Sequence, residues 1–245
     1  MFKAELRSDA LKGLINVIST LIDEVKFTIS PEGISLKAVD PAHVAMVEVS
    51  LGKGAFESYE ADDTEIGIDI DKVKDVLKLA SSGDIIYMEQ DEGRGRLIFK
   101  VGNITRRMNL VDTSSLNDPR VPQLELAASV EVPVTDLQKG IKASESISDH
   151  IALTADSDRF ELHCDGDTDS VDLVMEASNN VKIVADGKVS SMFPLDYFSN
   201  LIRAVPSDLR VRIELDTDFP VRIIFSLADG NGVVRYLLAP RIEKD

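Results

Sequence analysis

Apolar residues recur at helical spacing in the first part of the chain. In residues 9–22 they fall at i, i+3, i+4, i+7 and i+11, which places them on one face of an α-helix, and Ser8 or Asp9 is available as the N-cap. A shorter apolar stripe runs through residues 135–144. The pattern predicts two amphipathic helices, whose apolar positions are Leu11, Leu14, Ile15, Ile18 and Ile22 in the first and Leu137 and Ile141 in the second.

Two further segments share one apolar pattern at a constant offset of 125 residues. We expect each to be capped by an aspartate near its start, Asp71 in one and Asp196 in the other, where a carboxylate suits the positive end of a helix dipole. Alternating apolar and polar residues follow from Asp84 and from Leu209, which is typical of half-buried strands. The matched apolar positions are Ile70, Val73, Val76, Leu77 and Ala80, and Leu195, Phe198, Leu201, Ile202 and Val205.

These matches indicate that one unit of strands and two helices occurs twice in the chain. Between the copies, residues 112–125 contain Pro119, Pro122 and the turn-forming pair Asn117-Asp118, and they show neither period, which predicts an extended linker. We therefore expect an α+β fold of two similar domains, residues 1–111 and 126–245. Each should have antiparallel strands and two helices on one side of the sheet.

The charge of the chain changes the range of partners to consider. The formal net charge is −16, from 43 acidic and 27 basic residues. Charge of this sign, if spread uniformly, would repel DNA. One interpretation is a solvated surface that maintains solubility, in a cell with high internal salt. The other is a surface that binds basic partners.

The cysteine content and the absence of long apolar runs indicate a cytosolic protein. Cys164 is the only cysteine, which excludes an internal disulfide and fits a reducing compartment. No run approaches the roughly 18 apolar residues of a membrane span. Charges are scattered through the first residues, so we expect no signal peptide.

The last part of the chain carries a specific resemblance. The stretch DFPVRIIF at 218–225, the turn ADG at 228–230 and VRYLLAPRIE at 234–243 closely resemble the C-terminus of the PCNA-type DNA sliding clamps. Two shorter stretches, AVDPAHV at 38–44 and FESY at 56–59, resemble first-domain segments of that family. The resemblance runs from Met1 to about Glu243, and the two-domain length is that of archaeal and eukaryotic clamps; bacterial clamps have three domains.

The resemblance implies a head-to-tail homotrimer that encircles duplex DNA and has no catalytic activity. Six similar domains would form the ring, with the sheets outside and two helices per domain lining a central channel. Edge strands would pair between subunits, with residues 104–111 on one side and 172–177 on the other. The candidate interface residues are Arg106, Arg107, Asp172 and Glu176.

The resemblance also implies a basic inner surface. The alternative is that these cations are ordinary solvated side chains on helices. Gly13, Ser19, Asp75 and Asp196 stand where relatives carry Lys or Arg, so the channel should be less basic than in other clamps and should bind DNA more weakly. The candidate DNA-facing residues are Lys12, Lys72, Lys74, Lys78, Lys139, Lys142 and Arg203.

A peptide-binding pocket for replication enzymes is implied beneath the linker. Its expected partners are DNA polymerase, the clamp loader, flap endonuclease and DNA ligase, each through a short hydrophobic motif. Val44 and Met46 have an alternative as plain core residues, and Leu237 replaces an aromatic ring found in many relatives. The candidate pocket residues are Val39, His43, Val44, Met46, Val121, Pro122, Leu126, Pro220, Ala239, Pro240 and Ile242.

Other chemistry finds little support in the sequence. Residues 165–176 approach a calcium loop, but Ser170 stands where the turn needs Gly. Cys164 and His163 lack further zinc ligands nearby, and Gly93-Arg-Gly-Arg fits a hairpin turn. We expect no catalytic residues, no cofactor and no metal.

Two rival functions and the cellular location stay open at this point. The first rival is a subunit of a heteromeric clamp for damage signalling, and the second is an acidic calcium-binding or enzymatic α+β protein. A clamp should lie in the cytoplasm with the nucleoid if it is archaeal, and in the nucleus if it is eukaryotic.

Overall fold

The computed structural model describes residues 1–116 and 118–242. Asn117 of the linker and Glu243, where the resemblance ends, lie outside the described residues. Contacts between Cα atoms divide the chain into two compact units. Unit 1 comprises residues 1–121 and 226–234, and unit 2 comprises residues 122–225 and 235–245.

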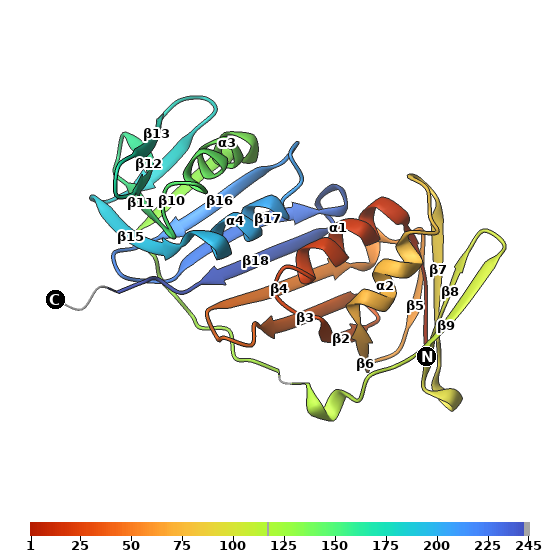
Figure 1. The fold of residues 1–245 in the computed structure, drawn as a ribbon. Helices are drawn as coiled ribbons and strands as arrows, with labels where there is room; N and C mark the ends of the chain where they lie inside the picture. The colour runs from red at the N-terminus through yellow and green to blue at the C-terminus, as the bar shows by residue number, and fades with distance from the viewer. Residues whose placement is uncertain (117, 243–245) are drawn as a thin grey trace. The chain divides into compact units, whose positions relative to one another are not determined.

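Unit 1 contains two antiparallel arrays of strands and the helices α1 and α2 (Figure 1). One array has the order β5-β1-β7-β8-β9, and in the other β4-β3-β2-β6 are neighbours. The elements are β1 (Phe2–Arg7), α1 (Ser8–Ile18), β2 (Glu24–Ser30), β3 (Gly33–Val39), β4 (Ala45–Gly52), β5 (Ser58–Ala61), β6 (Thr64–Asp69), α2 (Ile70–Leu77), β7 (Ile85–Asp91), β8 (Arg96–Val101) and β9 (Ile104–Asn109).

Unit 2 repeats this plan with the helices α3 and α4. One array has the order β13-β12-β11-β15, and in the other β14-β10-β16-β17 are neighbours. The elements are β10 (Ala128–Pro133), α3 (Val134–Ser144), β11 (His150–Ala155), β12 (Arg159–Asp165), β13 (Ser170–Glu176), β14 (Lys182–Ala185), β15 (Val189–Pro194), α4 (Leu195–Arg203), β16 (Arg210–Leu215), β17 (Val221–Leu227) and β18 (Gly232–Leu238).

The helical stripes of the sequence form the contact between helices and sheets. In α2 the side chains of Ile70, Val73, Val76 and Leu77 are buried, while the remaining residues of the helix face outward. The helices lie in pairs within each unit, α1 with α2 and α3 with α4. The predicted α+β class with two helices per half is therefore confirmed.

The first helix is shorter than its apolar pattern predicts. α1 ends at Ile18, and Ser19 forms its C-cap by donating its N–H to the carbonyl of Ile15 at 2.9 Å. Ile22 is therefore wrong as a helical position. The chain instead turns so that Leu21 is buried, at 8% exposure, and Ile22 is half-buried.

The predicted helix caps are also corrected. Arg7 is the N-cap of α1 and makes no side-chain capping bond. Ser8 instead donates its hydroxyl to the carbonyl of Ser81 at 2.7 Å, because the start of α1 lies beside the turn that follows α2. In α2 the cap is Asp69, which accepts from the Lys72 N–H at 3.1 Å, and Asp71 lies in the first turn.

The strands show where three of the sequence motifs lie in the structure. Gly95 has φ of 58° and closes the β7–β8 hairpin, which confirms the turn expected at Gly93-Arg-Gly-Arg. Residues 166–169 connect the paired strands β12 and β13. Cys164 on β12 is buried, with its Sγ 3.3 Å from the carbonyl oxygen of His150. No helix in the described ranges has the length and apolar character to cross a membrane.

Candidate nucleic-acid interface and partner groove

The helix α2 presents three of the predicted DNA-facing lysines to solvent. Burial of one face of the helix leaves Lys72, Lys74 and Lys78 on the other, with side-chain exposures of 50%, 40% and 74%. Asp71 and Asp75 alternate with them on the same face. Exposure of these lysines is expected both for DNA-facing side chains and for ordinary solvated ones, so their DNA-facing role stays a prediction.

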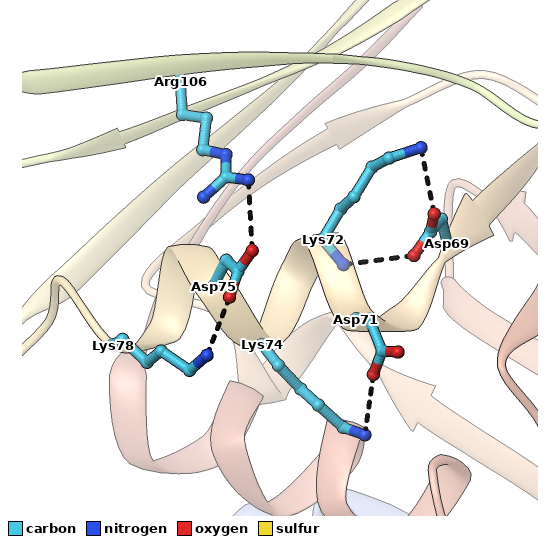
Figure 2. Close-up of polar contacts among 7 residues, drawn as sticks. All are labelled: Asp69, Asp71, Lys72, Lys74, Asp75, Lys78 and Arg106. Atoms are coloured by element: carbon cyan, nitrogen blue, oxygen red, sulfur yellow. Dashed lines mark hydrogen bonds and ion pairs between the residues drawn. The ribbon is translucent and has the colours of Figure 1, made fainter.

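Each of the three lysines is paired with the aspartate three residues before it (Figure 2). The Nζ–Oδ distances are 2.9 Å for Lys72 with Asp69, 3.0 Å for Lys74 with Asp71, and 2.8 Å for Lys78 with Asp75. Residues three apart are neighbours on a helix surface, so the spacing alone brings the charges together. The lysines are exposed but not electrostatically isolated.

Asp75 also reaches beyond its helix. Its Oδ2 lies 3.5 Å from Nη2 of Arg106 on β9, while its Oδ1 accepts from Lys78 (Figure 2). The hydrogen bond from Lys78, followed by the charge of Lys78, lowers the pKa of Asp75 below its usual value. A hydrogen bond from Lys72 likewise lowers the pKa of Asp69. Both carboxylates therefore stay ionised at neutral pH.

A shallow groove between α1 and α2 gathers three of the candidate cations. It has a volume of about 680 Å³, and Lys12, Lys74 and Lys78 are among its lining residues. Lys12 donates from Nζ to the carbonyl oxygen of Ala80 at 3.1 Å. This groove in unit 1 is the place where the predicted basic surface is most concentrated.

The cations of unit 2 differ in their surroundings. Lys139 lies 3.5 Å from Asp136, three residues before it. Arg203 forms an ion pair with Glu145, which also accepts from the Ser199 hydroxyl at 2.6 Å. Among the described residues, Lys142 has no carboxylate within ion-pair distance and no side-chain hydrogen bond.

The groove beside α4 is more acidic than its counterpart in unit 1. Its volume is about 520 Å³, and Glu145, Asp149 and Asp196 line it together with Arg203. The sequence predicts that Asp196 makes the surface less basic, and this residue stands in the groove. The two units therefore offer unequal surfaces on their helices.

One wall of the predicted partner pocket is built by a turn between β3 and β4. Asp40 is 4% exposed and accepts from the N–H groups of Ala42, Val44 and Ala45 at 3.0, 2.8 and 2.7 Å. These bonds hold the turn in which His43 adopts a positive φ of 58° and stays exposed. Asp40 is missing from the predicted site, although its position in the AVDPAHV stretch is a signal for it.

The linker approaches this turn within unit 1. A depression of about 540 Å³ is lined by Val39 and His43 and by linker residues 115, 116, 118 and 119. Val111 precedes the linker and donates its N–H to the carbonyl of Gly67 at 2.8 Å. A Cβ on Gly67 would lie 2.3 Å from the Val111 carbonyl oxygen. Thr113–Ser115 form a short 3₁₀ turn, so the linker is not extended throughout.

The remaining pocket residues fall into both units. In unit 1 Met46 is buried, which fits its interpretation as a core residue, whereas Val44 and Val121 are half-buried. In unit 2 the carbonyl oxygen of Leu124 accepts from Arg222 at 2.9 Å. The unit 2 members range from half-buried to exposed: Pro122, Leu126, Pro220, Ala239, Pro240 and Ile242.

The comparisons with known proteins agree along the entire chain. The model for the proliferating cell nuclear antigen N-terminal domain matches residues 1–116, and the model for its C-terminal domain matches residues 120–241. The chain belongs to the PCNA family. A DNA polymerase sliding clamp of Methanosarcina mazei is 44% identical over 246 residues, covering 100% of both chains.

Two solved PCNA structures have the same fold. A. fulgidus PCNA, solved with the C-terminal region of FEN-1 bound, superimposes with a TM-score of 0.92 at 32% identity and covers 100% of both chains. PCNA from Thermococcus kodakaraensis superimposes with a TM-score of 0.91 at 24% identity, over 98% of this chain and 100% of that one.

The strands predicted as PCNA subunit edges are terminal strands here. β9 ends one array of unit 1 and β13 ends one array of unit 2, and each exposes an apolar side chain: Ile104 at 49% and Val174 at 48%. Within the chain Arg106 pairs with Asp75, and Oδ1 of Asp172 lies 2.7 Å from Nδ1 of His163. Whether these strands, with Arg107 and Glu176, contact a second subunit stays a prediction.

The spacing of charges along the sequence contains a further signal for the surroundings of the candidate lysines. An aspartate stands three residues before five of the six candidate lysines: Lys12, Lys72, Lys74, Lys78 and Lys139. Lys142 is the exception, because residue 139 is itself a lysine. Asp75 therefore does not only replace a cation found in relatives, because it also forms ion pairs with Lys78 and Arg106.

Proposed function

We propose that this chain is a DNA polymerase sliding clamp that encircles duplex DNA as a homotrimer and tethers replication and repair enzymes without catalysing a reaction. The observation that carries the proposal is the match of both PCNA domain models over the chain, together with the paired helices that each unit places on its sheet. The proposed domains are residues 1–111 and 126–245, with residues 112–125 as the connector.

A closed ring can hold DNA although the acidic chain as a whole repels the phosphates. A closed ring stays on the duplex because the duplex passes through it, so strong phosphate contacts are unnecessary and weak ones permit sliding. No base readout is required, because the clamp has to move along any sequence. The cations that the four helices offer for these weak contacts are Lys12, Lys72, Lys74, Lys78, Lys139, Lys142 and Arg203.

The terminal strands β9 and β13 suit the contacts between subunits. A strand at the edge of a sheet offers unpaired N–H and C=O groups, and two different edges on one chain make a head-to-tail contact that can close into a ring. Arg106 and Arg107 on β9 carry charge opposite to that of Asp172 and Glu176 on β13. Exposed ion pairs contribute at most about 1 kcal/mol each, so the strand pairing would dominate.

The partner pocket is proposed at the turn after β3, the connector and the residues that follow β18. Apolar groups and prolines form a surface that suits an aromatic anchor of a short peptide. A. fulgidus PCNA, solved with the C-terminal region of FEN-1 bound, supports a terminal segment of a partner protein as the ligand. Flap endonuclease, DNA polymerase, DNA ligase and a clamp loader are the proposed partners, and the nucleoid is the proposed location.

The test depends on whether the DNA has free ends from which a closed ring can slide. With a cognate polymerase and loader, the protein should raise the length of product on primed circular DNA and lose this effect on linear DNA with free ends, where a ring slides off. Equal stimulation on both templates would contradict the proposal. Light scattering measures the mass of the assembly and thereby distinguishes the clamp from its rival. A trimer supports the clamp, whereas a monomer supports a calcium-binding or enzymatic protein.

A further inference from the structure

The outer face of α2 is close to electrically neutral. The seven residues of Figure 2 comprise four cations and three carboxylates, and every carboxylate contacts at least one of the cations. Asp75 contacts two, Lys78 at 2.8 Å and Arg106 at 3.5 Å. A count of lysines therefore overstates the positive potential that this face presents.

The carboxylates that compensate the lysines are themselves exposed. The side chain of Asp71 is 73% exposed and that of Asp75 is 48% exposed. A phosphate that approaches Lys74 or Lys78 therefore also meets a nearby negative charge. Attraction and repulsion act over the same few ångströms, so neither lysine should displace a counterion from DNA as a free lysine does.

We propose that Asp71 and Asp75 compete with DNA phosphates for Lys74 and Lys78, and thereby keep the contact of this face with duplex DNA weak and only slightly dependent on salt. The inference rests on the proposed function, in which this face is turned to DNA, and it assigns the residues that set the strength of the contact. Asp69 pairs with Lys72 in the same way, but it also caps the helix.

Lys142 provides the contrast within the same chain. Among the described residues it has no carboxylate within ion-pair distance. Its charge should therefore be available to a phosphate without competition. We expect Lys142 to contribute more to DNA affinity than Lys74 or Lys78, although Lys78 has a highly exposed side chain.

The main experiment compares the double variant D71N/D75N with a matched control, D91N/D156N. Asp91 and Asp156 also pair with an arginine three residues later, at 3.3 and 3.5 Å, but they lie outside the helices. Both variants remove two negative charges and two ion pairs of the same spacing, and D71N/D75N also removes the contact of Asp75 with Arg106. Binding to a short linear duplex is measured by fluorescence anisotropy over a series of salt concentrations.

We expect D71N/D75N to bind more tightly at low salt and with a steeper salt dependence. Each lysine freed for a phosphate should add about 0.9 to the slope of log K against log salt. For two freed lysines, the loss of affinity between about 50 and 200 mM salt should grow roughly tenfold. The control should keep the wild-type slope. Equal slopes for D71N/D75N and D91N/D156N would overturn the inference.

A second comparison separates freed lysines from a general change in net charge. Adding K74Q/K78Q to D71N/D75N should return the slope to the wild-type value, and a gain that persists would overturn the inference. In the wild-type background, Lys142→Gln should reduce the slope more than Lys74→Gln does. This comparison does not depend on the aspartate variants being folded, and equal reductions would count against the inference.

Failure of the inference about Asp71 and Asp75 can be distinguished from failure of the proposed clamp function. If the wild type stimulates a polymerase only on circular templates while the variant slopes are equal, the clamp function stands and the role of Asp71 and Asp75 fails. If the wild type shows no dependence on a circular template, the clamp function fails first, and the inference that rests on it falls with it.

Discussion

Several aspartates in this acidic chain have a structural role in addition to their charge. Asp40 accepts three backbone N–H groups inside the turn after β3, and Asp112 accepts the N–H of Ser114 at 2.9 Å where the linker begins. Asp9 accepts from the Ser82 hydroxyl and the Gly83 N–H, both at 2.9 Å, and so ties α1 to the turn after α2. A carboxylate suits these places because it offers only acceptors.

The hydrogen bonds to Asp9 predict a specific pH dependence. The bond from Ser82, and next the one from Gly83, lower the pKa of Asp9 below 3.8 in the folded state. A depressed carboxylate pKa contributes stability that is present above the unfolded pKa and is lost as pH falls through the folded pKa. Asp9→Asn should therefore be less stable than the wild type near neutral pH, with the difference shrinking below about pH 4.

Urea unfolding of the wild type and Asp9→Asn over this pH range measures the effect. Asp186→Asn serves as the control, because Asp186 lies in the exposed turn between β14 and β15, and it should show a much smaller change. A difference between wild type and Asp9→Asn that stays constant down to the lowest pH would contradict the assignment.

At the scale of elements, the glycines at matching positions in α1 and α3 have different surroundings. Gly13 in α1 and Gly140 in α3 stand in the matching stretches Lys-Gly-Leu and Lys-Gly-Ile. A Cβ on Gly13 would meet only Leu227, at 3.8 Å, which is ordinary contact. A Cβ on Gly140 would lie 2.5 Å from Cδ2 and 3.1 Å from Cβ of Leu173, because α3 packs closely against β13.

Alanine substitution at these two positions should have opposite effects. Gly13→Ala should stabilise the protein by about 0.5–1 kcal/mol, since glycine inside a helix carries an entropic cost. Gly140→Ala should lose this gain and destabilise, because Leu173 on the edge strand has to move. Thermal unfolding of both variants tests the pair, and stabilisation by Gly140→Ala would show that α3 and β13 are not in close contact.

Local patterns predict the elements better than their ends. The apolar period locates α2 and α4 because one buried face determines the helical register. It places the end of α1 too late, since Ile22 continues the period although the chain has already turned at Ser19. The cap of α1 is missed because Ser8 is bound by Ser81, a residue far along the chain. The buried acceptor Asp40 and the aspartate–lysine spacing could both have been found from local sequence.

At the scale of the whole molecule, the proposed trimer has to reconcile a net charge of −16 per chain with close contact between identical subunits. At low ionic strength like charges repel over long range, whereas the Debye length falls from about 10 Å at 0.1 M salt to about 3 Å at 1 M. The proposed strand pairing between β9 and β13 is backbone hydrogen bonding and apolar contact, which salt screens little. The sequence predicts the family but does not determine this balance.

The proposed trimer should therefore become more stable as salt increases. Sedimentation velocity at fixed protein concentration should show the trimer fraction rising between about 0.1 and 1 M salt, as the Debye length shrinks. The charge-reversal variant Arg107→Glu should weaken the trimer most at low salt. A trimer fraction that falls with salt would instead mean that ion pairs of the kind Arg107–Glu176 hold the subunits together.

The burial of Cys164 has a practical consequence for studying this protein. Burial raises the pKa of its thiol, and its side chain is 1% exposed, so the thiolate that reacts with maleimides is scarce and covered. A cysteine introduced on the surface should take up a dye while the native one does not. Site-specific labels can then follow the protein on single DNA molecules without removing any native residue.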